Sequence, residues 1–550
     1  MSERNSSSSP VDTDWWRGAV IYQIYPRSYQ DTDGDGTGDL KGITERLPHI
    51  ASLGVDAIWV SPFFKSPMRD FGYDVSDYED VDPMFGTIGD FKEMVDRAHG
   101  LGLKVMIDQV LSHSSSEHPW FIESRSSRTN DKADWYVWAD AKPDGSPPNN
   151  WLSIFGGSAW QWDTGRRQYY LHNFLASQPD FNLHNPDVQD ALLGTVRFWL
   201  DLGVDGFRLD TINFYFHDRE LHDNPPLMPE MRNASIAPDV NPYNFQDHLY
   251  DKNQPENLEF LRRLRALLET YPGSAAVGEV GDAQRGLQIV SDYTSGGDKV
   301  HMCYSFDLLS ATPPTVGHLS KVVSDFETTV TDGWACWAFS NHDVRRHATR
   351  WSETFGDSPR HLKLLAGVLL TLRGSVCIYQ GEELGLPEAD LSFEDLRDPY
   401  GIQFWPTFKG RDGCRTPMVW SADDRNGGFS SGKPWLPVPG EHLALAVGRQ
   451  EADPDSVLSH YRNFIGFRKQ HLPLVKGSVE LDHQNDKVFC FRRRHGNETI
   501  ICAFNMSDEA QTIELADDDV STLPGSGFAG TSTGKTITIP PIDAYFGLVG

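Results

Sequence analysis

Acidic residues at the ends of apolar segments are the first candidates for chemistry in this sequence. Asp108, Asp210, Glu279 and Asp343 each close such a segment, as in "KVMID" and "GFRLD". Any single acid in such a place could cap a helix or bind a lysine. Four that face one site would instead form a group of carboxylates suited to acid and base catalysis.

Aromatic residues near these acids favour a sugar as the bound molecule. Carboxylates accept hydrogen bonds from sugar hydroxyls, and rings such as those of Tyr73, Trp120 and Phe174 can cover the apolar faces of a pyranose. A metal-dependent hydrolase is an alternative use of the same acids. It is less favoured, because the first predicted strand has no His-x-His and no early strand ends in Lys.

Cleavage of a glycosidic bond requires one ionised and one protonated carboxyl group. Arg208 precedes Asp210 by two residues, so both side chains should lie on one face of a strand, where the cation would lower the pKa of Asp210. Glu279 follows the apolar run "AAVG", where desolvation would raise its pKa. We therefore predict that Asp210 is the nucleophile and Glu279 the general acid and base.

A repeated junction indicates how these acids are positioned. It occurs in "SLGVDAIWV", "GLGLKVMID" and "DLGVDGFRLD", where Leu-Gly follows a segment of helical periodicity and precedes an apolar strand. A glycine directly after such a segment is typical of the end of a helix. The repeating unit is therefore helix, glycine, strand.

Eight strand candidates recur along the chain and alternate with helical or loop sequence. They lie within residues 19–29, 52–60, 100–108, 201–210, 275–280, 301–309, 334–343 and 375–381. This alternation predicts a parallel sheet, and eight units favour a (β/α)8 TIM barrel over an open doubly wound sheet. In such a barrel the active site lies at the carboxyl ends of the strands, which is where the acids stand.

Two regions interrupt the alternation and define the predicted domains. Residues 114–185 are rich in Trp, Pro, Asn and Gly, lack helical periodicity, and should form a subdomain inserted after the third strand. Residues 473–550 show alternating strands and turns, with a hairpin at Gly496-Asn497, and should form a C-terminal antiparallel β-sandwich. The barrel would then comprise residues 14–113 and 186–472, and residues 1–13 would be a flexible polar tail.

The run "DTDGDGTGDL" begins like a calcium-binding EF-hand loop but does not complete it. Asp31, Asp33, Asp35 and Gly36 have the required spacing, whereas the twelfth position, which needs Glu, is Gly42. The preceding segment, "AVIYQIYPRSY", predicts a strand and not a helix. We expect a cation-binding loop of another kind, with a solvated acidic turn as the alternative.

Composition and charge disfavour several classes of protein. A net charge of −29 argues against nucleic-acid binding, and no apolar run reaches the roughly 18 residues of a membrane span. The polar N-terminus lacks the apolar stretch of a signal peptide, which predicts a cytoplasmic protein. The six cysteines are scattered singly and fit buried thiols better than disulfides or a zinc site.

Four ordered motifs resemble the signature regions of the α-amylase family, glycoside hydrolase family thirteen: "DQVLSH" (108–113), "GFRLD" (206–210), "GEV" (278–280) and "FSNHD" (339–343). "QPDFN" (178–182), "GYDVSDY" (72–78) and "GRDGCRTPMVW" (410–420) resemble its oligo-1,6-glucosidase and α-glucosidase branch, in particular bacterial α-glucosidases. The resemblance covers nearly all of the chain beyond the polar tail. It implies a retaining exo-α-glucosidase that releases α-linked glucose from small α-glucosides such as maltose, with sucrose and alkyl or aryl glucosides as further candidates.

The resemblance implies a role for each matched residue. Asp210 would be the nucleophile, Glu279 the acid and base, and Asp343 a third acid that grips sugar hydroxyls. Asp70 and Arg415 would pair across the closed end of the pocket and hold the terminal 4-hydroxyl; taken alone they would be an ordinary surface acid and base. The terminal glucose would also be bound by Tyr73, His113, Phe155, Phe174, Gln178, Arg208, Thr211 and His342.

A structural ion is implied by the same resemblance. Related α-glucosidases hold one Ca²⁺ or Mg²⁺ in the loop that corresponds to residues 31–40. The ligands here would be the carboxylates of Asp31, Asp33, Asp35 and Asp39 and the backbone oxygen of Thr37. Catalysis itself would need no metal.

Two residues depart from or refine the family pattern. Ser112 stands where the first motif usually has Asn. In many amylases that Asn belongs to a calcium site between barrel and subdomain, so we do not expect that site here.

Thr211 follows the nucleophile. In this branch, Val at that position accompanies α-1,6 cleavage, and Thr or Ala accompanies α-1,4 cleavage. We therefore predict α-1,4 preference, with simple packing of Thr211 in the barrel wall as the alternative.

Other functions would use similar sequence features. A glucosyl transferase or isomerase, such as a sucrose isomerase or trehalose synthase, would share every catalytic residue, and the motifs do not decide between water and a sugar acceptor. A non-catalytic, transporter-associated relative would tend to lose the acids and carry a membrane segment, unlike this chain. The enzyme is expected to be a monomer or a homodimer.

Overall fold

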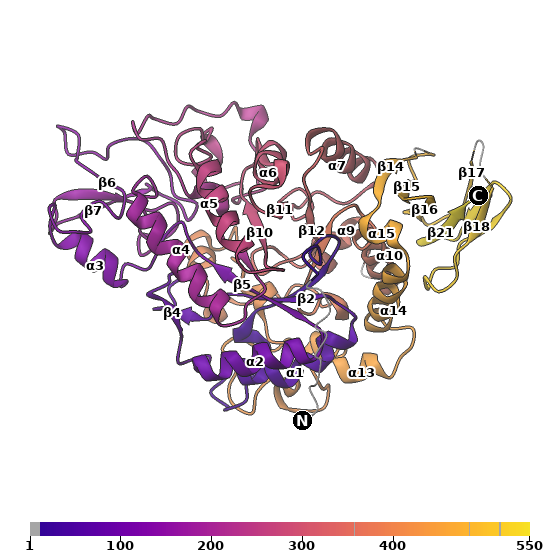
Figure 1. Cartoon of the computed structure of the whole chain (residues 1–550). Helices are drawn as coiled ribbons and strands as arrows, with labels where there is room; N and C mark the ends of the chain where they lie inside the picture. The colour runs from indigo at the N-terminus through magenta and orange to yellow at the C-terminus, as the bar shows by residue number, and fades with distance from the viewer. Residues whose placement is uncertain (1–11, 357, 483, 516–518) are drawn as a thin grey trace, which may run out of the picture.

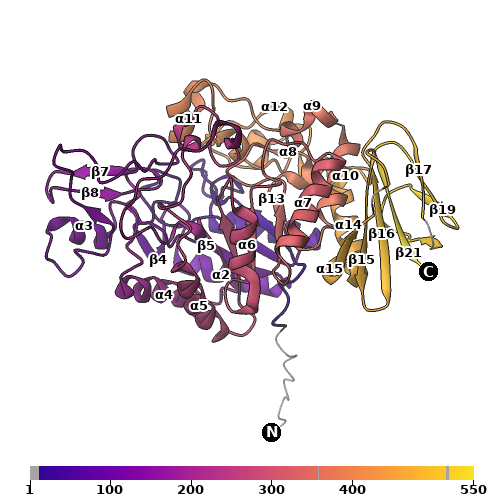
Figure 2. The same ribbon diagram turned by 90° about the horizontal axis from the view of Figure 1, so that it is seen from above.

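The chain forms a TIM barrel with an inserted subdomain and a C-terminal β domain. The computed structural model describes residues 12–356, 358–482, 484–515 and 519–550, so most of the predicted polar tail lies outside the described residues. Figure 1 shows the inserted subdomain, with α3, β6 and β7, on one side of the barrel and the C-terminal domain on the opposite side. The view at right angles shows the same arrangement (Figure 2).

Eight parallel strands form the barrel. Seven lie within the predicted ranges, and β5 extends one residue beyond its range, to Gln109. Their order is β11-β10-β9-β5-β2-β1-β13-β12, and a parallel bridge between Cys303 and Ala335 joins the two outer strands. The strands are β1 (Val20–Ile24), β2 (Ala57–Val60), β5 (Lys104–Gln109), β9 (Gly206–Leu209), β10 (Ala275–Val280), β11 (Met302–Ser305), β12 (Cys336–Ala338) and β13 (Ser375–Tyr379).

Helices follow the strands and cover the outside of the barrel. The main ones are α1 (Leu40–Ser52), α2 (Ile88–Gly100), α4 (Pro186–Asp201), α5 (Asn257–Glu269), α6 (Gly286–Thr294), α7 (Val316–Thr329), α10 (Pro359–Leu369) and α14 (Val457–Gln470). The predicted Leu-Gly junctions are confirmed. A leucine caps each of α1, α2 and α4, and the next residue, Gly54, Gly102 or Gly203, has a positive φ of 81°, 79° or 95°.

Strand periodicity separates two apolar layers. Ile21 belongs to the cluster inside the barrel, together with Trp59, Met106 and Val277, whereas its neighbour Tyr22 belongs to the large cluster between strands and helices. The six cysteines are all buried and unpaired. Among the described residues, no helix is long and apolar enough to cross a membrane.

The subdomain between β5 and α4 contains a small antiparallel sheet of β6 (Trp138–Ala139), β8 (Gln168–Leu171) and β7 (Trp160–Asp163). It also contains the helix α3 (Pro119–Ser126), which the lack of periodicity in this region did not predict. Pro119 at the first helical position and the His118 side chain, which accepts the Trp120 N–H, start this helix.

The C-terminal domain pairs two antiparallel sheets. One has the order β14-β15-β16-β21-β18 and the other β17-β20-β19. The predicted hairpin is confirmed, since Gly496 and Asn497 join β15 (Val488–His495) to β16 (Glu498–Asn505). The remaining strands are β14 (Ser478–Leu481), β17 (Gln511–Glu514), β18 (Val520–Thr522), β19 (Thr531–Thr533), β20 (Thr536–Ile539) and β21 (Asp543–Val549).

Candidate active site

Adjacent barrel strands bring the predicted acids together. Asp108 in β5 is the register partner of Arg208 in β9, and Glu279 in β10 is the partner of Tyr304 in β11. Asp210 follows the last residue of β9. These side chains come from the carboxyl ends of four neighbouring strands, as expected for a barrel of this type.

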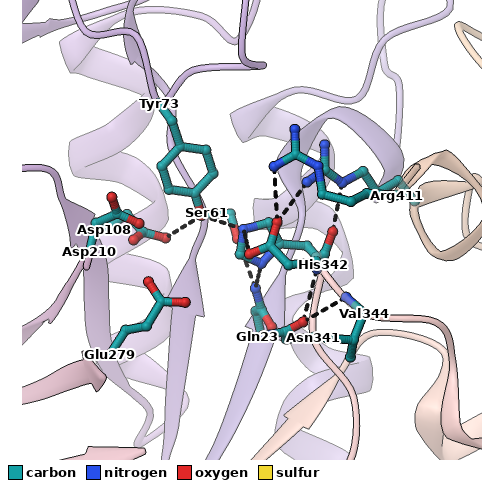
Figure 3. Close-up of polar contacts among 12 residues, drawn as sticks. Gln23, Ser61, Tyr73, Asp108, Asp210, Glu279, Asn341, His342, Val344 and Arg411 are labelled. Atoms are coloured by element: carbon teal, nitrogen blue, oxygen red, sulfur yellow. Dashed lines mark hydrogen bonds and ion pairs between the residues drawn. The ribbon is translucent and has the colours of Figure 1, made fainter. Parts of the chain in front are cut away.

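Asp343 does not end a strand, which differs from the expectation. Strand β12 ends at Ala338, and Asp343 lies in the loop that follows it. The Asn341 side chain shapes this loop, because its Oδ1 accepts the N–H groups of Asp343 and Val344. Figure 3 shows Asp108, Asp210 and Glu279 on one side of Tyr73, with His342 and Arg411 on the other.

One guanidinium group binds three of the carboxylates. Arg208 Nη1 lies 2.6 Å from Asp108 Oδ1 and 2.6 Å from Asp210 Oδ1, and Nη2 lies 2.6 Å from Glu279 Oε2. The Arg208 side chain is fully buried. Its Nε and Nη2 also donate to the Tyr304 hydroxyl. A single cation, itself shielded from solvent, therefore contacts three carboxyl groups.

The expected split in pKa between the two central acids is not what the structure shows. Burial raises the pKa of Asp210 to about 7, although Arg208 acts in the opposite direction, and burial raises the pKa of Glu279 to about 7 as well. The prediction that Arg208 would hold the pKa of Asp210 low is wrong in net direction, because desolvation outweighs one cation shared by three acids. The group should retain a proton near neutral pH.

Asp343 behaves differently from these acids. Burial opposes its ionisation, but the neighbouring His342, Arg411 and Arg415 outweigh that effect and hold the pKa of Asp343 well below its usual range. His342 Nδ1 accepts from Gln23 Nε2 at 2.7 Å, and His342 Nε2 is hydrogen-bonded to the Tyr73 hydroxyl and lies 3.1 Å from Asp343 Oδ2. These neighbours thus favour the ionised form of Asp343, which is suited to accept hydrogen bonds from sugar hydroxyls.

Asp70 and Arg415 do not pair with each other as the resemblance implied. Asp70 Oδ1 binds Arg411 Nη2 at 2.7 Å, and its Oδ2 accepts from Gln178 Nε2 at 3.0 Å. Arg415 instead binds Asp343 Oδ1 at 2.9 Å and donates from Nε to the His342 carbonyl at 2.6 Å. Arg411 links the Asp70 pair to the Asp343 pair, since its Nη2 binds Asp70 and its Nη1 lies 3.2 Å from Asp343 Oδ1.

The pocket at this end of the barrel has a volume of about 850 Å³. Nine predicted residues line it: Asp70, Tyr73, His113, Phe155, Phe174, Asp210, Thr211, Glu279 and Asp343. Four others lie behind that lining and are at most 1% exposed: Gln178, Arg208, His342 and Arg415. Those four would act on a ligand through the residues they hold.

Several residues of the site were not predicted. Arg411 lines the pocket and binds Asp70, Asp343 and Asp398. It stands in "GRDGCRTPMVW", so the motif contained the signal, but the identity of its partners did not follow from spacing. The rest of the lining is mixed. Its apolar residues include Ile154, Phe214, Ile236, Leu391, Leu396 and Phe408, and its charged residues include Arg345, Arg350, Glu388, Asp390 and Lys409.

The acidic loop contains a group of carboxylates that fits a cation. Ligand oxygens of Asp31, Asp33 and Asp39 lie within 4.8 Å of one another, and carboxylate oxygens are the ligands that Ca²⁺ and Mg²⁺ prefer. Asp35 is outside this group, contrary to the expectation; its Oδ1 accepts the Thr37 N–H. The Thr37 carbonyl as a ligand stays a prediction.

Family models match nearly the whole chain. The α-amylase catalytic domain matches residues 23–477, and the C-terminal domain of maltogenic amylase matches residues 479–545. A probable α-glucosidase of Rhizobium meliloti (strain 1021) is 65% identical, over 99% of this chain and 99% of its own. An oligo-1,6-glucosidase of Heyndrickxia coagulans is 36% identical, over 95% of this chain and 97% of its own.

Solved structures agree with these matches. The crystal structure of an α-glucosyl transfer enzyme, XgtA, superposes with a TM-score of 0.95 at 52% identity and covers 98% of this chain and 99% of its own. The trehalulose synthase MutB from Pseudomonas mesoacidophila MX-45 superposes with a TM-score of 0.87 at 33% identity. The match covers 98% of this chain and 99% of that structure's chain.

Proposed function

Because the chain belongs to the α-amylase family and is a glycoside hydrolase of the α-glucosidase type, we propose that it is a retaining exo-α-glucosidase. Its substrates would be short α-1,4-linked glucosides such as maltose. The observation that carries this proposal is the bridging of Asp210 and Glu279 by one buried guanidinium group. It keeps the two carboxyls close together, as a retaining pair needs.

The reaction would proceed in two steps. Glu279 would donate its proton to the glycosidic oxygen while Asp210 attacks the anomeric carbon and forms a glucosyl ester. Glu279 would then take a proton from water, which attacks the same carbon and restores Asp210. Asp343 would bind hydroxyls of the terminal glucose throughout, because its neighbours keep it ionised.

The closed end of the pocket supports release of single glucose units. Asp70, Arg411 and Asp343 form a continuous set of ion pairs there, so a sugar chain could not pass through. Thr211 lines the pocket beside both acids, which supports a role in α-1,4 preference over simple packing in the barrel wall.

Asp210→Asn tests the nucleophile. This variant should lose about 10³-fold or more in kcat on maltose and on an aryl α-glucoside, since the ester cannot form. Glu279→Gln is the matched comparison: it should remain active on an aryl α-glucoside with a good leaving group and be rescued by azide. Near wild-type glucose release by Asp210→Asn, or initial release of β-glucose from maltose, would contradict the proposal.

Transfer of glucose to an acceptor is a second candidate function. Apolar side chains in the pocket lining, such as Ile154, Phe214 and Phe408, could hold an acceptor in place of water, and the similar enzyme XgtA is described as an α-glucosyl transfer enzyme. NMR analysis of the products from maltose and from sucrose would separate the functions. Hydrolysis gives two glucose molecules per maltose, or equal amounts of glucose and fructose from sucrose. Transfer gives one glucose per maltose, or one fructose per sucrose, together with a new glucoside. A rearranged disaccharide without free glucose would indicate an isomerase.

A further inference from the structure

Ser112 occupies an unusual place beside the active site. It is 2% exposed and is not part of the pocket lining, yet it lies between two residues that are. Its Oγ is 2.9 Å from His113 Nδ1 and 3.1 Å from Thr211 Oγ1. The Ser112 hydroxyl therefore connects the loop after β5 to the loop after β9.

Thr211 contacts both central acids. Its Oγ1 lies 3.2 Å from Asp210 Oδ2, and its backbone N–H donates to Glu279 Oε2 at 3.0 Å. Thr211 has φ 41° and ψ 49°, a left-handed conformation that β-branched residues rarely adopt. Such a conformation persists only where surrounding contacts hold it. The Ser112 hydroxyl is one of these contacts.

One tautomer of His113 makes hydrogen bonds of all the contacts that link His113, Ser112, Thr211 and Asp210. An ionised Asp210 can only accept, so the single hydroxyl proton of Thr211 points to Asp210 Oδ2. Thr211 Oγ1 then accepts from Ser112, whose oxygen must accept from His113 Nδ1–H. In this tautomer the other ring nitrogen, Nε2, accepts from Gln178 Nε2 at 3.1 Å. The other tautomer would donate from Nε2 to the Tyr73 carbonyl, also at 3.1 Å, and would leave no proton between Ser112 and Thr211.

We propose that Ser112 is a positioning residue, whose hydroxyl holds the Thr211 side chain against Asp210 Oδ2 and so passes the hydrogen bond of His113 on to the nucleophile. Arg208 binds Oδ1 of Asp210, so Oδ2 is the oxygen that remains to attack the sugar. The chain of hydroxyls fixes the orientation of that oxygen. The inference rests on the proposed function, since it takes Asp210 as the nucleophile.

Four variants test the chain of hydrogen bonds: Ser112→Ala, Thr211→Val, their double variant, and Thr211→Ser. The first two each remove one hydroxyl, and Thr211→Ser keeps the hydroxyl while losing the methyl group. The readouts are kcat and KM on an aryl α-glucoside, and the pH profile of kcat/KM. Melting temperature and circular dichroism confirm that each variant is folded.

Ser112→Ala should lower kcat about 3- to 10-fold with little change in KM. It should also move the acidic limb of the pH profile up by about half a unit to one unit, because the ionised form of Asp210 loses support. Thr211→Val should do the same, and the double variant should be no worse than Thr211→Val alone. Thr211→Ser should keep the acidic limb of the pH profile at its wild-type position, because it retains the hydroxyl.

Two results would overturn the inference. One is an unshifted acidic limb in folded Ser112→Ala; the other is a double variant whose losses are the sum of the single losses. If Ser112→Ala does not fold, the two Thr211 variants decide. The inference would be overturned if Thr211→Val and Thr211→Ser had the same acidic limb in the pH profile of kcat/KM. Failure of the proposed function would be seen separately, as glucose release by Asp210→Asn.

Discussion

Arg208 determines the charge state of the site at the scale of single residues. Its one positive charge is shared by Asp108, Asp210 and Glu279, all of which are almost completely buried. Three carboxylates around one cation leave excess negative charge in a low dielectric, which favours binding of a proton. A nucleophile and an acid in one cluster need this intermediate state, with one carboxyl ionised and the other protonated.

This state predicts a bell-shaped pH profile of kcat/KM for the free enzyme, centred near neutral pH. Activity should rise as Asp210 loses its proton and fall as Glu279 loses its own, and burial raises both pKa values to about 7. Because the two groups are coupled, the two limbs belong to the pair. Initial rates on an aryl α-glucoside between pH 4 and 10 measure them. A plateau that extends from pH 5 to 9 would contradict the prediction.

Arg411 should matter for binding at the closed end of the pocket. It pairs with Asp70, Asp343 and Asp398, so Arg411→Met would remove an ion-pair partner from the buried Asp70 and Asp398, while Asp343 keeps Arg415. We expect a lower melting temperature and a fall of about 10- to 100-fold in kcat/KM for maltose. Lys409→Met is the control, because Lys409 also lines the pocket but pairs with the exposed Asp390. Equal losses in the two variants would contradict this role.

At the scale of elements, the acidic loop connects the start of α1 to a distant segment. Asp39 caps α1 by accepting the Gly42 N–H, and its Oδ2 accepts from Thr32. Asp31 receives a hydrogen bond from the Ser430 hydroxyl, and Trp435 N–H donates to the Gly36 carbonyl. A bound cation would neutralise the carboxylates and stiffen this junction.

Removal of the cation should therefore lower stability. EDTA should reduce the melting temperature by several degrees, and Asp33→Asn should do the same and abolish the EDTA effect. Asp35→Asn is the matched control and should change the melting temperature much less, since Asp35 lies outside the group of three carboxylates. Differential scanning calorimetry with and without Ca²⁺ or Mg²⁺ measures this. A melting temperature insensitive to both EDTA and Asp33→Asn would favour the solvated acidic turn.

At the scale of the whole molecule, the barrel and the C-terminal domain share one apolar core. Phe546 in β21 packs against Phe464 and Phe467 of α14, with ring centroids 5.4 and 5.6 Å apart. The buried Arg493 of β15 also donates to the Thr371 carbonyl, between α10 and β13. The two parts should therefore unfold together.

Phe546→Ala should destabilise both parts by about 3–5 kcal/mol, because it leaves a cavity in that shared core. The kinetic constants at 25 °C should stay near those of the wild type, since Phe546 is not part of the pocket lining. Chemical denaturation followed by tryptophan fluorescence measures the loss. Leu472→Ala, at a leucine that is 54% exposed, should cost much less. A separate unfolding transition of the C-terminal domain in the wild type would contradict the shared core.

The local pattern of the sequence was enough to predict the barrel, and the family resemblance added most of the pocket. Apolar runs and Leu-Gly junctions located all eight strands, because strand and helix periodicity and glycine caps act over a few residues. The resemblance that those motifs carry also located nine residues that line the pocket. Where periodicity was weak, the prediction failed: α3 begins with a proline and a histidine cap and was not expected.

Tertiary structure alone decided the charges and the pairings. Asp70 binds Arg411 and not Arg415, and Asp35 lies outside the carboxylate group, because both depend on distances between loops. The pKa of Asp210 is raised and not lowered, because burial depends on everything packed around the residue. The contact of Ser112 with Thr211 has the same origin, since it joins residues 99 positions apart. Periodicity and capping depend on residues close in sequence and can be recognised there. Desolvation and ion pairing depend on distant segments that come together only in the folded protein.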